Sequence, residues 1–187
     1  HLLVSPHHTR KSYIKLIDNE IEHAKKGNPS GIFLKMNSLC DIKLIDKLYE
    51  ASSYGVKIRL IVRGICSLIP GVKGLSENIE AISILDRFLE HSRILVFENG
   101  GDQKYYLSSA DWMQRNLDYR VEVSVPVYDP NIKRQLRDHL EIIWKDNVKA
   151  RWFNEDQKNE YRFINGPKIR SQFALYDYVK NQLKRGK

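Results

Sequence analysis

A histidine and an arginine two positions apart, His91 and Arg93, are the residues of this sequence best suited to chemistry. They stand at the start of the apolar run 94–97, which predicts a β-strand, so both side chains point to one face of it. An imidazole can exchange a proton, and a guanidinium beside it can bind two oxygens of a phosphoryl group. Two hydroxyls that follow, at Ser108 and Ser109, would add hydrogen-bond donors. The spacing favours a phosphate site with His91 as its catalytic residue and Arg93, Ser108 and Ser109 as further phosphate ligands. An ordinary surface or half-buried histidine followed by turn serines is the alternative interpretation.

A second arginine, Arg63, also stands where a strand is expected to end. In the stretch 56–62 apolar residues alternate with Lys57 and Arg59, which is the period of a half-buried strand. Gly64 follows, so the Arg63 side chain can reach a pocket at the carboxyl edge of the sheet, where ligands of open α/β sheets bind. A solvated surface arginine is the alternative interpretation.

The elements that must position these residues alternate along the chain. Apolar periodicity and turn residues predict strands at 2–5, 32–36, 56–62, 80–84, 93–98, 104–108, 119–127 and 148–153. Predicted helices cover 9–26, the stretch between a capping Asp41 and Gly55, a stretch begun by Asp129-Pro130 with Ile132, Leu136, Leu140 and Ile143 facing inward, and 168–183. Residues 64–78 read as a loop. This alternation favours an α/β domain in which helices flank a sheet.

Positive charge is concentrated near the carboxyl end. The 187 residues carry a net charge of +8, and residues 148–187 contain ten Lys or Arg against four Asp or Glu. We therefore expect a catalytic domain at 1–150 and a basic, partly helical extension at 151–187, packed on it. In one interpretation the last helix docks through an apolar face made of Ile169, Phe173, Tyr176, Val179 and Leu183. In the other, its interleaved cations and aromatics hold a polyanion, either single-stranded nucleic acid or polyphosphate.

Other features of the sequence carry little chemistry. Cys40 and Cys66 fit no metal or disulfide spacing and are expected to be free thiols in a reducing compartment. His1, His7 and His8 lack an acidic or thiolate companion, so no metal site is expected there. Apolar runs are too short to span a bilayer. The chain opens without Met, inside an apolar run, which suggests a piece of a longer protein.

The spacing His91-x-Arg93-x4-Glu98, followed by Ser108-Ser109-Ala110-Asp111-Trp112, resembles a variant of the H-x-K-x4-D and G-S-x-N signature of the phospholipase D superfamily. That resemblance implies a phospholipase-D-like mixed sheet in which two half-sites meet at one phosphate. Arg93 and Glu98 replace the usual Lys and Asp, which argues against ordinary phosphodiesterase chemistry.

The flanking segments are more specific. They resemble, in order and from Leu2 to about Tyr178, the C-terminal domain of bacterial polyphosphate kinase; the segments are 35–39, 60–66, 88–93, 97–102 and 106–113. In that family ATP phosphorylates an enzyme histidine, and the phosphoryl group passes reversibly to the end of a polyphosphate chain.

The resemblance implies roles for individual residues. Arg63 corresponds to an arginine that binds nucleotide phosphate, and His91 to a second essential histidine, a phosphate ligand and general acid or base. The nucleophilic histidine and the ligands of Mg²⁺ would lie in preceding domains of the same chain, so the fragment alone should be inactive. The implied partners are ATP or ADP and inorganic polyphosphate, with no specific nucleic acid. The full-length protein would be a homo-oligomer in the cytoplasm or at the membrane periphery.

Two alternatives stay open at this point. One is a phosphodiesterase half-domain for nucleic acid or lipid, which would pair two half-sites by dimerising. The other is a non-catalytic polyanion-binding module that depends on the basic extension, with a steep dependence on salt.

Overall fold

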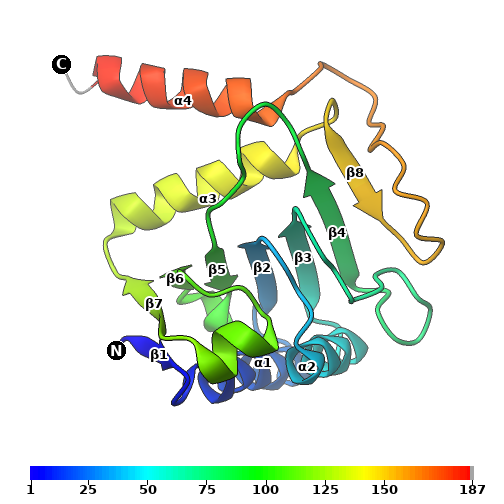
Figure 1. Ribbon diagram of the computed structural model, residues 1–187, viewed down its shortest axis with the longest axis vertical. Coiled ribbons are helices and arrows are strands. Elements are labelled where there is room, and N and C mark those ends of the chain that lie inside the picture. The colour runs from blue at the N-terminus through cyan, green and yellow to red at the C-terminus, as the bar shows by residue number, and fades with distance from the viewer. Residues whose placement is uncertain (186–187) are drawn as a thin grey trace.

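A computed structural model describes residues 1–185 and contains one mixed sheet of eight strands in the order β1-β7-β6-β5-β2-β3-β4-β8 (Figure 1). Its central strands β2, β3 and β4 run parallel, and all other neighbours are antiparallel. The strands are β1 (Leu3–Ser5), β2 (Gly31–Met36), β3 (Lys57–Val62), β4 (Ile79–Ile84), β5 (Ile94–Phe97), β6 (Lys104–Ser108), β7 (Glu122–Val127) and β8 (Ala150–Phe153). The expected α/β architecture is confirmed.

Helices cover both faces of this sheet (Figure 1). They are α1 (Thr9–Lys25), α2 (Ile42–Ser53), α3 (Pro130–Trp144) and α4 (Ser171–Arg185). The helices α1 and α2 pack with Ile32 and Leu34 of β2 on one face, whereas α3 packs with Phe33 on the other. Because successive residues of a strand point to opposite faces, β2 is buried on both sides and reads as a continuous apolar run.

Local sequence signals explain where two helices begin. The carboxylate of Asp41 accepts a hydrogen bond from the backbone N–H of Leu44 at the start of α2. Asp129 caps α3 in the same way, and Pro130 occupies its first turn. Both caps were expected, since Asp satisfies N–H groups that lack a partner in the first turn.

Two element boundaries differ by three residues from the sequence prediction, and the others differ by two at most. The strand expected from residue 119 begins at Glu122, because 115–119 form a single π-helical turn. The last helix begins at Ser171 instead of Lys168. The backbone N–H of Ser171 donates to the buried carboxylate of Asp146 (2.7 Å), and that of Ile169 donates to the side chain of Asn147 (2.7 Å). These two bonds keep residues 168–170 out of the helix.

The face through which α4 packs is not the expected one. Phe173, Tyr176, Val179 and Leu183 are 46–69% exposed. The helix instead packs through Gln172, which is buried, and Leu175, which is partly buried against the α3 cluster. The Tyr178 hydroxyl also donates to Asp138 of α3 (2.8 Å). The inward face predicted for α3 also begins later, since Ile132 is 46% exposed. In both helices the apolar spacing predicted a helix correctly, but several of the apolar residues predicted to face the core are exposed.

The C-terminal extension is continuous with the sheet. The boundary expected at residue 150 falls on the first residue of β8, which pairs with β4 through Ile84 and Ala150. Residues 154–170 then return along this edge, with an isolated bridge between Arg151 and Tyr161.

Candidate functional site

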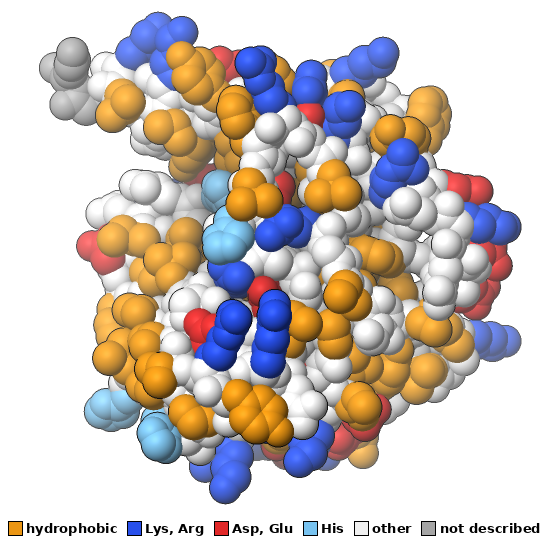
Figure 2. Space-filling model, viewed as in Figure 1, with side chains coloured by type: hydrophobic (Ala, Val, Ile, Leu, Met, Phe, Trp, Pro, Cys, Tyr) orange, Lys and Arg blue, Asp and Glu red, His pale blue; other side chains and the backbone are white. Residues whose placement is uncertain are grey.

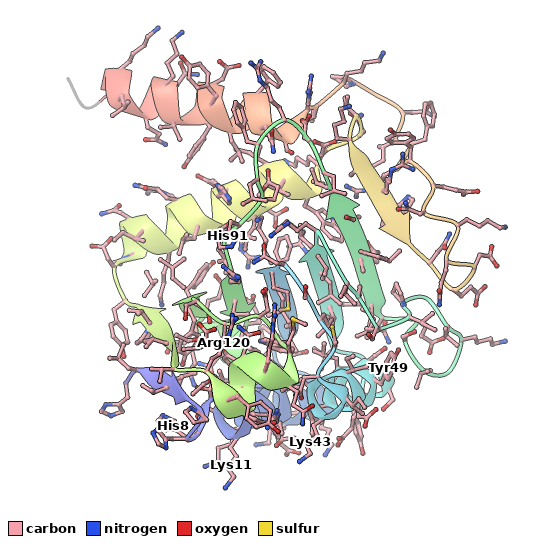
Figure 3. All side chains as sticks on the ribbon, in the orientation of Figure 1. His8, Lys11, Lys43, Tyr49, His91 and Arg120 are labelled. Atoms are coloured by element: carbon pink, nitrogen blue, oxygen red, sulfur yellow. The ribbon has the colours of Figure 1, made fainter. Side chains whose placement is uncertain are left out.

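Polar side chains gather at one edge of the sheet, where β2 and β3 end and β5 begins. Asn37 follows β2, Arg63 follows β3 and Arg93 precedes β5. Since β5 runs antiparallel to β2, its first residues lie at the same edge as the carboxyl ends of the parallel strands. Figure 3 shows His91 at this end of β5, and Figure 2 shows histidine beside Lys and Arg side chains at the same place. The sheet thus brings Arg63 to the same edge as the pair His91 and Arg93, which was predicted separately from it.

A chain of hydrogen bonds connects these residues. Arg63 Nε donates to Asn37 Oδ1 at 2.7 Å, and the backbone N–H of Asn37 donates to Asp111 Oδ1 at 2.8 Å. Arg93 donates two hydrogen bonds to the same carboxylate, from Nε (3.3 Å) and Nη2 (3.0 Å). Its remaining nitrogen, Nη1, lies 3.2 Å from Nδ1 of His91. Arg93 therefore orients His91 and is itself fixed by Asp111.

Asp111 is the anchor of this network. Burial raises the pKa of its carboxyl, but the Arg93 guanidinium and the backbone N–H groups of Asn37 and Ser38 outweigh burial and hold the pKa below its usual range. The carboxylate is therefore charged at neutral pH. Its backbone partners Asn37 and Ser38 lie more than 70 residues earlier in the chain, so Asp111 joins two distant segments.

Two groups at this edge remain available to a ligand. The terminal Nη1 and Nη2 of Arg63 make no hydrogen bond within residues 1–185, while its Nε is held by Asn37. His91 is exposed and contacts Arg93 through its ring. A fixed guanidinium with free N–H groups and an exposed imidazole at the same sheet edge can bind an oxyanion and exchange a proton with it.

Lys35 was missed by sequence reasoning and lies beneath the site. Its side chain is 1% exposed and its Nζ lies 3.2 Å from Glu90, in the loop that carries His91. Burial lowers the pKa of Lys35, against the opposing effect of Glu90. Glu90 also accepts a hydrogen bond from Gln172 at the start of α4 (2.8 Å). The sequence signal that could have pointed to Lys35 is its position as the one cation inside the apolar run 32–36.

The start of α4 holds the same loop by further contacts. Gln172 bonds to both the N–H and the carbonyl of Phe88 (2.9 and 2.8 Å), and Arg170 binds Asp86 at 2.8 Å. The loop before His91 is therefore fixed by the C-terminal extension.

The hydroxyls of Ser108 and Ser109 do not point into this network. The backbone N–H of Ser108 donates to the carbonyl of Arg93 (3.1 Å), so this residue lies beside the site. The Ser108 hydroxyl bonds to Ser124 (2.7 Å) and to the N–H of Ala110 (3.0 Å), and the Ser109 hydroxyl bonds to Glu122. Within residues 1–185 neither hydroxyl hydrogen-bonds to Arg63, His91 or Arg93. Their spacing is that of a phosphate-binding turn, but the hydroxyls are engaged in joining β6 to β7.

In the part of the chain that the structure describes, no group of three or more His, Cys, Asp or Glu side chains could hold a metal ion. No helix there is long and apolar enough to cross a bilayer. Cys40 and Cys66 are free, and burial raises the pKa of both thiols, that of Cys66 to about 11.

The sheet and the position of the site define a phospholipase-D-like fold. A phospholipase D family member from Salmonella typhimurium superimposes with a TM-score of 0.61, covering 82% of this chain and 97% of its own at 13% identity. At that identity the likeness concerns the fold alone, and it confirms the fold expected from the signature.

The chain belongs to the family described as polyphosphate kinase C-terminal domain 2, which it matches over residues 2–172. It is 52% identical over 182 residues to the polyphosphate kinase of Escherichia coli K12, and 55% over 180 residues to that of Yersinia pestis. These matches cover 97% and 96% of this chain but 26% of each relative, so the chain spans about a quarter of their length.

A solved structure agrees with this assignment. The polyphosphate kinase of Porphyromonas gingivalis superimposes with a TM-score of 0.95 at 43% identity, covering 98% of this chain and 28% of its own. The resemblance stated from the residue segments is thereby confirmed.

Proposed function

We propose that the protein to which this chain belongs is a polyphosphate kinase, which transfers the terminal phosphoryl group of ATP reversibly to polyphosphate. A histidine nitrogen in a preceding domain takes the phosphoryl group and releases ADP, then passes it to the terminal oxygen of the polyphosphate chain. Family membership and the names of the relatives support this activity. The observation that carries it for this chain is the juxtaposition of Arg63, His91 and Arg93 at one sheet edge.

The residues of this chain would stabilise the transferred group. Phosphoryl transfer depends on neutralising charge on the non-bridging oxygens more than on covalent assistance. Arg63 has two free N–H donor groups for those oxygens. His91 binds the same phosphoryl group and exchanges a proton with it, while Arg93 orients the imidazole. Ser108 and Ser109 stay outside this proposal because their hydroxyls are engaged elsewhere.

Magnesium does not fit the residues described here. The two carboxylates nearest the site are engaged, Glu90 by Lys35 and Gln172, and Asp111 by Arg93 and Asn37. Any Mg²⁺ that accompanies the nucleotide would find its protein ligands in the preceding domains, and no step proposed for this chain runs through the metal. Those domains would complete the site, in a homo-oligomer in the cytoplasm or on the cytoplasmic face of a membrane, where ATP is available.

The first test is His91→Ala in the full-length protein. Loss of a group that binds and exchanges a proton should lower the rate of polyphosphate synthesis from ATP by about 10²- to 10⁴-fold. The measurement is ATP-dependent polyphosphate formation, with thermal unfolding to show that the fold is retained. His8→Ala is the matched control, since His8 is an exposed histidine just before α1, away from His91 (Figure 3). Wild-type activity in the His91 variant would remove this residue from the site.

A further inference from the structure

A hollow of about 420 Å³ adjoins Arg63 where β3 and β4 end and β8 begins. Its charged lining consists of Arg63, Lys149 and Arg151, with no acidic residue, and Tyr161 forms part of one wall. Figure 2 shows Lys and Arg side chains gathered on this side of the molecule, over β8 and the extension. The hollow is therefore electropositive, and Arg63 belongs both to it and to the phosphate site.

The sheet sets these cations in a row. In the order β5-β2-β3-β4-β8, register places Ile61 opposite Ile82, and Ile84 opposite Ala150. Arg63 consequently lies level with the start of β8. At about 4.8 Å per strand, β3 and β8 are about 10 Å apart, and β5 and β8 about 19 Å. Positive groups thus follow the sheet edge from His91 and Arg93 through Arg63 to Lys149 and Arg151.

The cations of the hollow are available and one of them is fixed in place. Arg151 Nη1 donates to the carbonyl of Asn159 (2.6 Å), and its guanidinium stacks on the Tyr161 ring at 3.8 Å. Within residues 1–185, Lys149 Nζ has no hydrogen-bond or ion-pair partner. The carboxylate of Asp86 near it is already bound by Arg170 at 2.8 Å. Two cations without counter-charges in a hollow attract an anion, and a fixed guanidinium loses less entropy on binding it.

We propose that this hollow is a second anion subsite, which binds phosphoryl groups of a polyphosphate chain several units away from the reacting end. The inference rests on the proposed function and extends it to the substrate chain. A row of cations that crosses several strands suits an extended polyanion running perpendicular to them. The phosphates of a nucleotide share the same chemistry but form a short, compact group that Arg63 and His91 alone can bind.

The experiment compares chain lengths in the full-length protein. In the ATP-forming direction, KM is measured for long-chain polyphosphate and for tripolyphosphate, and also for ADP, in wild type and Lys149→Ala/Arg151→Ala. The ratio of the KM for the long chain to that for tripolyphosphate should rise about tenfold, equivalent to 1.4 kcal/mol, which is within the range of one charge-assisted contact. Lys11→Ala/Lys43→Ala is the matched control. It removes the same charge at the opposite end of the molecule (Figure 3) and should leave this ratio unchanged.

The outcomes separate the two proposals. An unchanged ratio in an active Lys149→Ala/Arg151→Ala enzyme overturns the subsite and leaves the proposed function standing. A rise in the KM for ADP with no change in the ratio also overturns it, because the hollow would then serve the nucleotide. A wild-type protein without any polyphosphate reaction overturns both. Lys149→Ala alone, which removes no side-chain hydrogen bond or ion pair within residues 1–185, should raise the ratio in the same direction and guards against misfolding.

Discussion

Lys35 shows how a single buried charge can govern a neighbouring site. Its ammonium group is enclosed by the sheet and paired with Glu90, one residue before His91 in the same loop. Removing one partner of a buried ion pair leaves the other charge uncompensated, whereas removing both is often tolerated. The pair therefore fixes the loop that presents His91.

At the residue scale we predict that Lys35→Met lowers the free energy of unfolding by about 3 kcal/mol, since Glu90 loses its cation. The double variant Lys35→Met/Glu90→Gln should recover most of that loss. A glutamine at 90 is neutral and still accepts the hydrogen bond from Gln172. Urea unfolding of the three proteins provides the comparison. A double variant as unstable as Lys35→Met would mean that the loss is one of packing rather than of charge.

Asp146 joins two elements that are far apart in the sequence. Its carboxylate is fully buried and accepts hydrogen bonds from the N–H groups of residues 148–150 at the start of β8 (2.7–3.1 Å) and of Ser171 at the start of α4 (2.7 Å). Burial raises the pKa of this carboxyl, but the backbone donors outweigh burial and hold the pKa below its usual range.

At the element scale, Asp146→Asn should therefore destabilise the protein at neutral pH by about 2 kcal/mol. Because the folded pKa is depressed, the stabilisation is complete above the unfolded value of about 3.9 and is lost as the pH falls through the folded pKa. The difference between wild type and variant should accordingly shrink on acidification. Asp129→Asn is the control, as Asn caps a helix equally well. Thermal unfolding between pH 7 and pH 2 measures both, and a difference independent of pH would argue against the carboxylate.

The local elements were predictable from the sequence, whereas the contacts between them were not. Arg63 and His91 could be found because each stands at the end of a periodic apolar stretch. The link between Asn37 and Asp111 spans 74 residues and exists only because β5 inserts beside β2. Ser108 was predicted to bind phosphate only because it stands in a turn with a second serine. In the structure its hydroxyl bonds to that of Ser124 on β7. Pairing across the sheet decides such roles.

The whole molecule has a well-formed core, although the chain spans only about a quarter of the length of its relatives. Both faces of the sheet carry a buried apolar cluster, one with α1 and α2 and the other with α3. Burial of apolar surface on this scale is the main driving force for folding. The phosphate site, in contrast, is incomplete. The terminal N–H groups of Arg63 at the sheet edge, on Nη1 and Nη2, have no partner within residues 1–185, and in the proposed mechanism the nucleophile lies in another domain.

At this scale we predict that the purified 187-residue chain unfolds cooperatively on heating but forms no polyphosphate from ATP. Calorimetry and a polyphosphate assay on the same preparation test the two parts. Turnover by the chain alone would contradict the proposed division of the site between domains. Hydrolysis of a phosphodiester by the chain would instead favour the phosphodiesterase alternative.

The pairing of β1 with β7 has a consequence for synthesis on the ribosome. Leu3–Ser5 pairs with residues 122–124, so β1 can join the sheet only after about 120 further residues have been made. At 5–20 residues per second, translation imposes a delay of about 6 to 24 s on this step. During that interval the segment before α1 has no strand to pair with. Within this domain, β1 is thus the first strand made and among the last to reach its place.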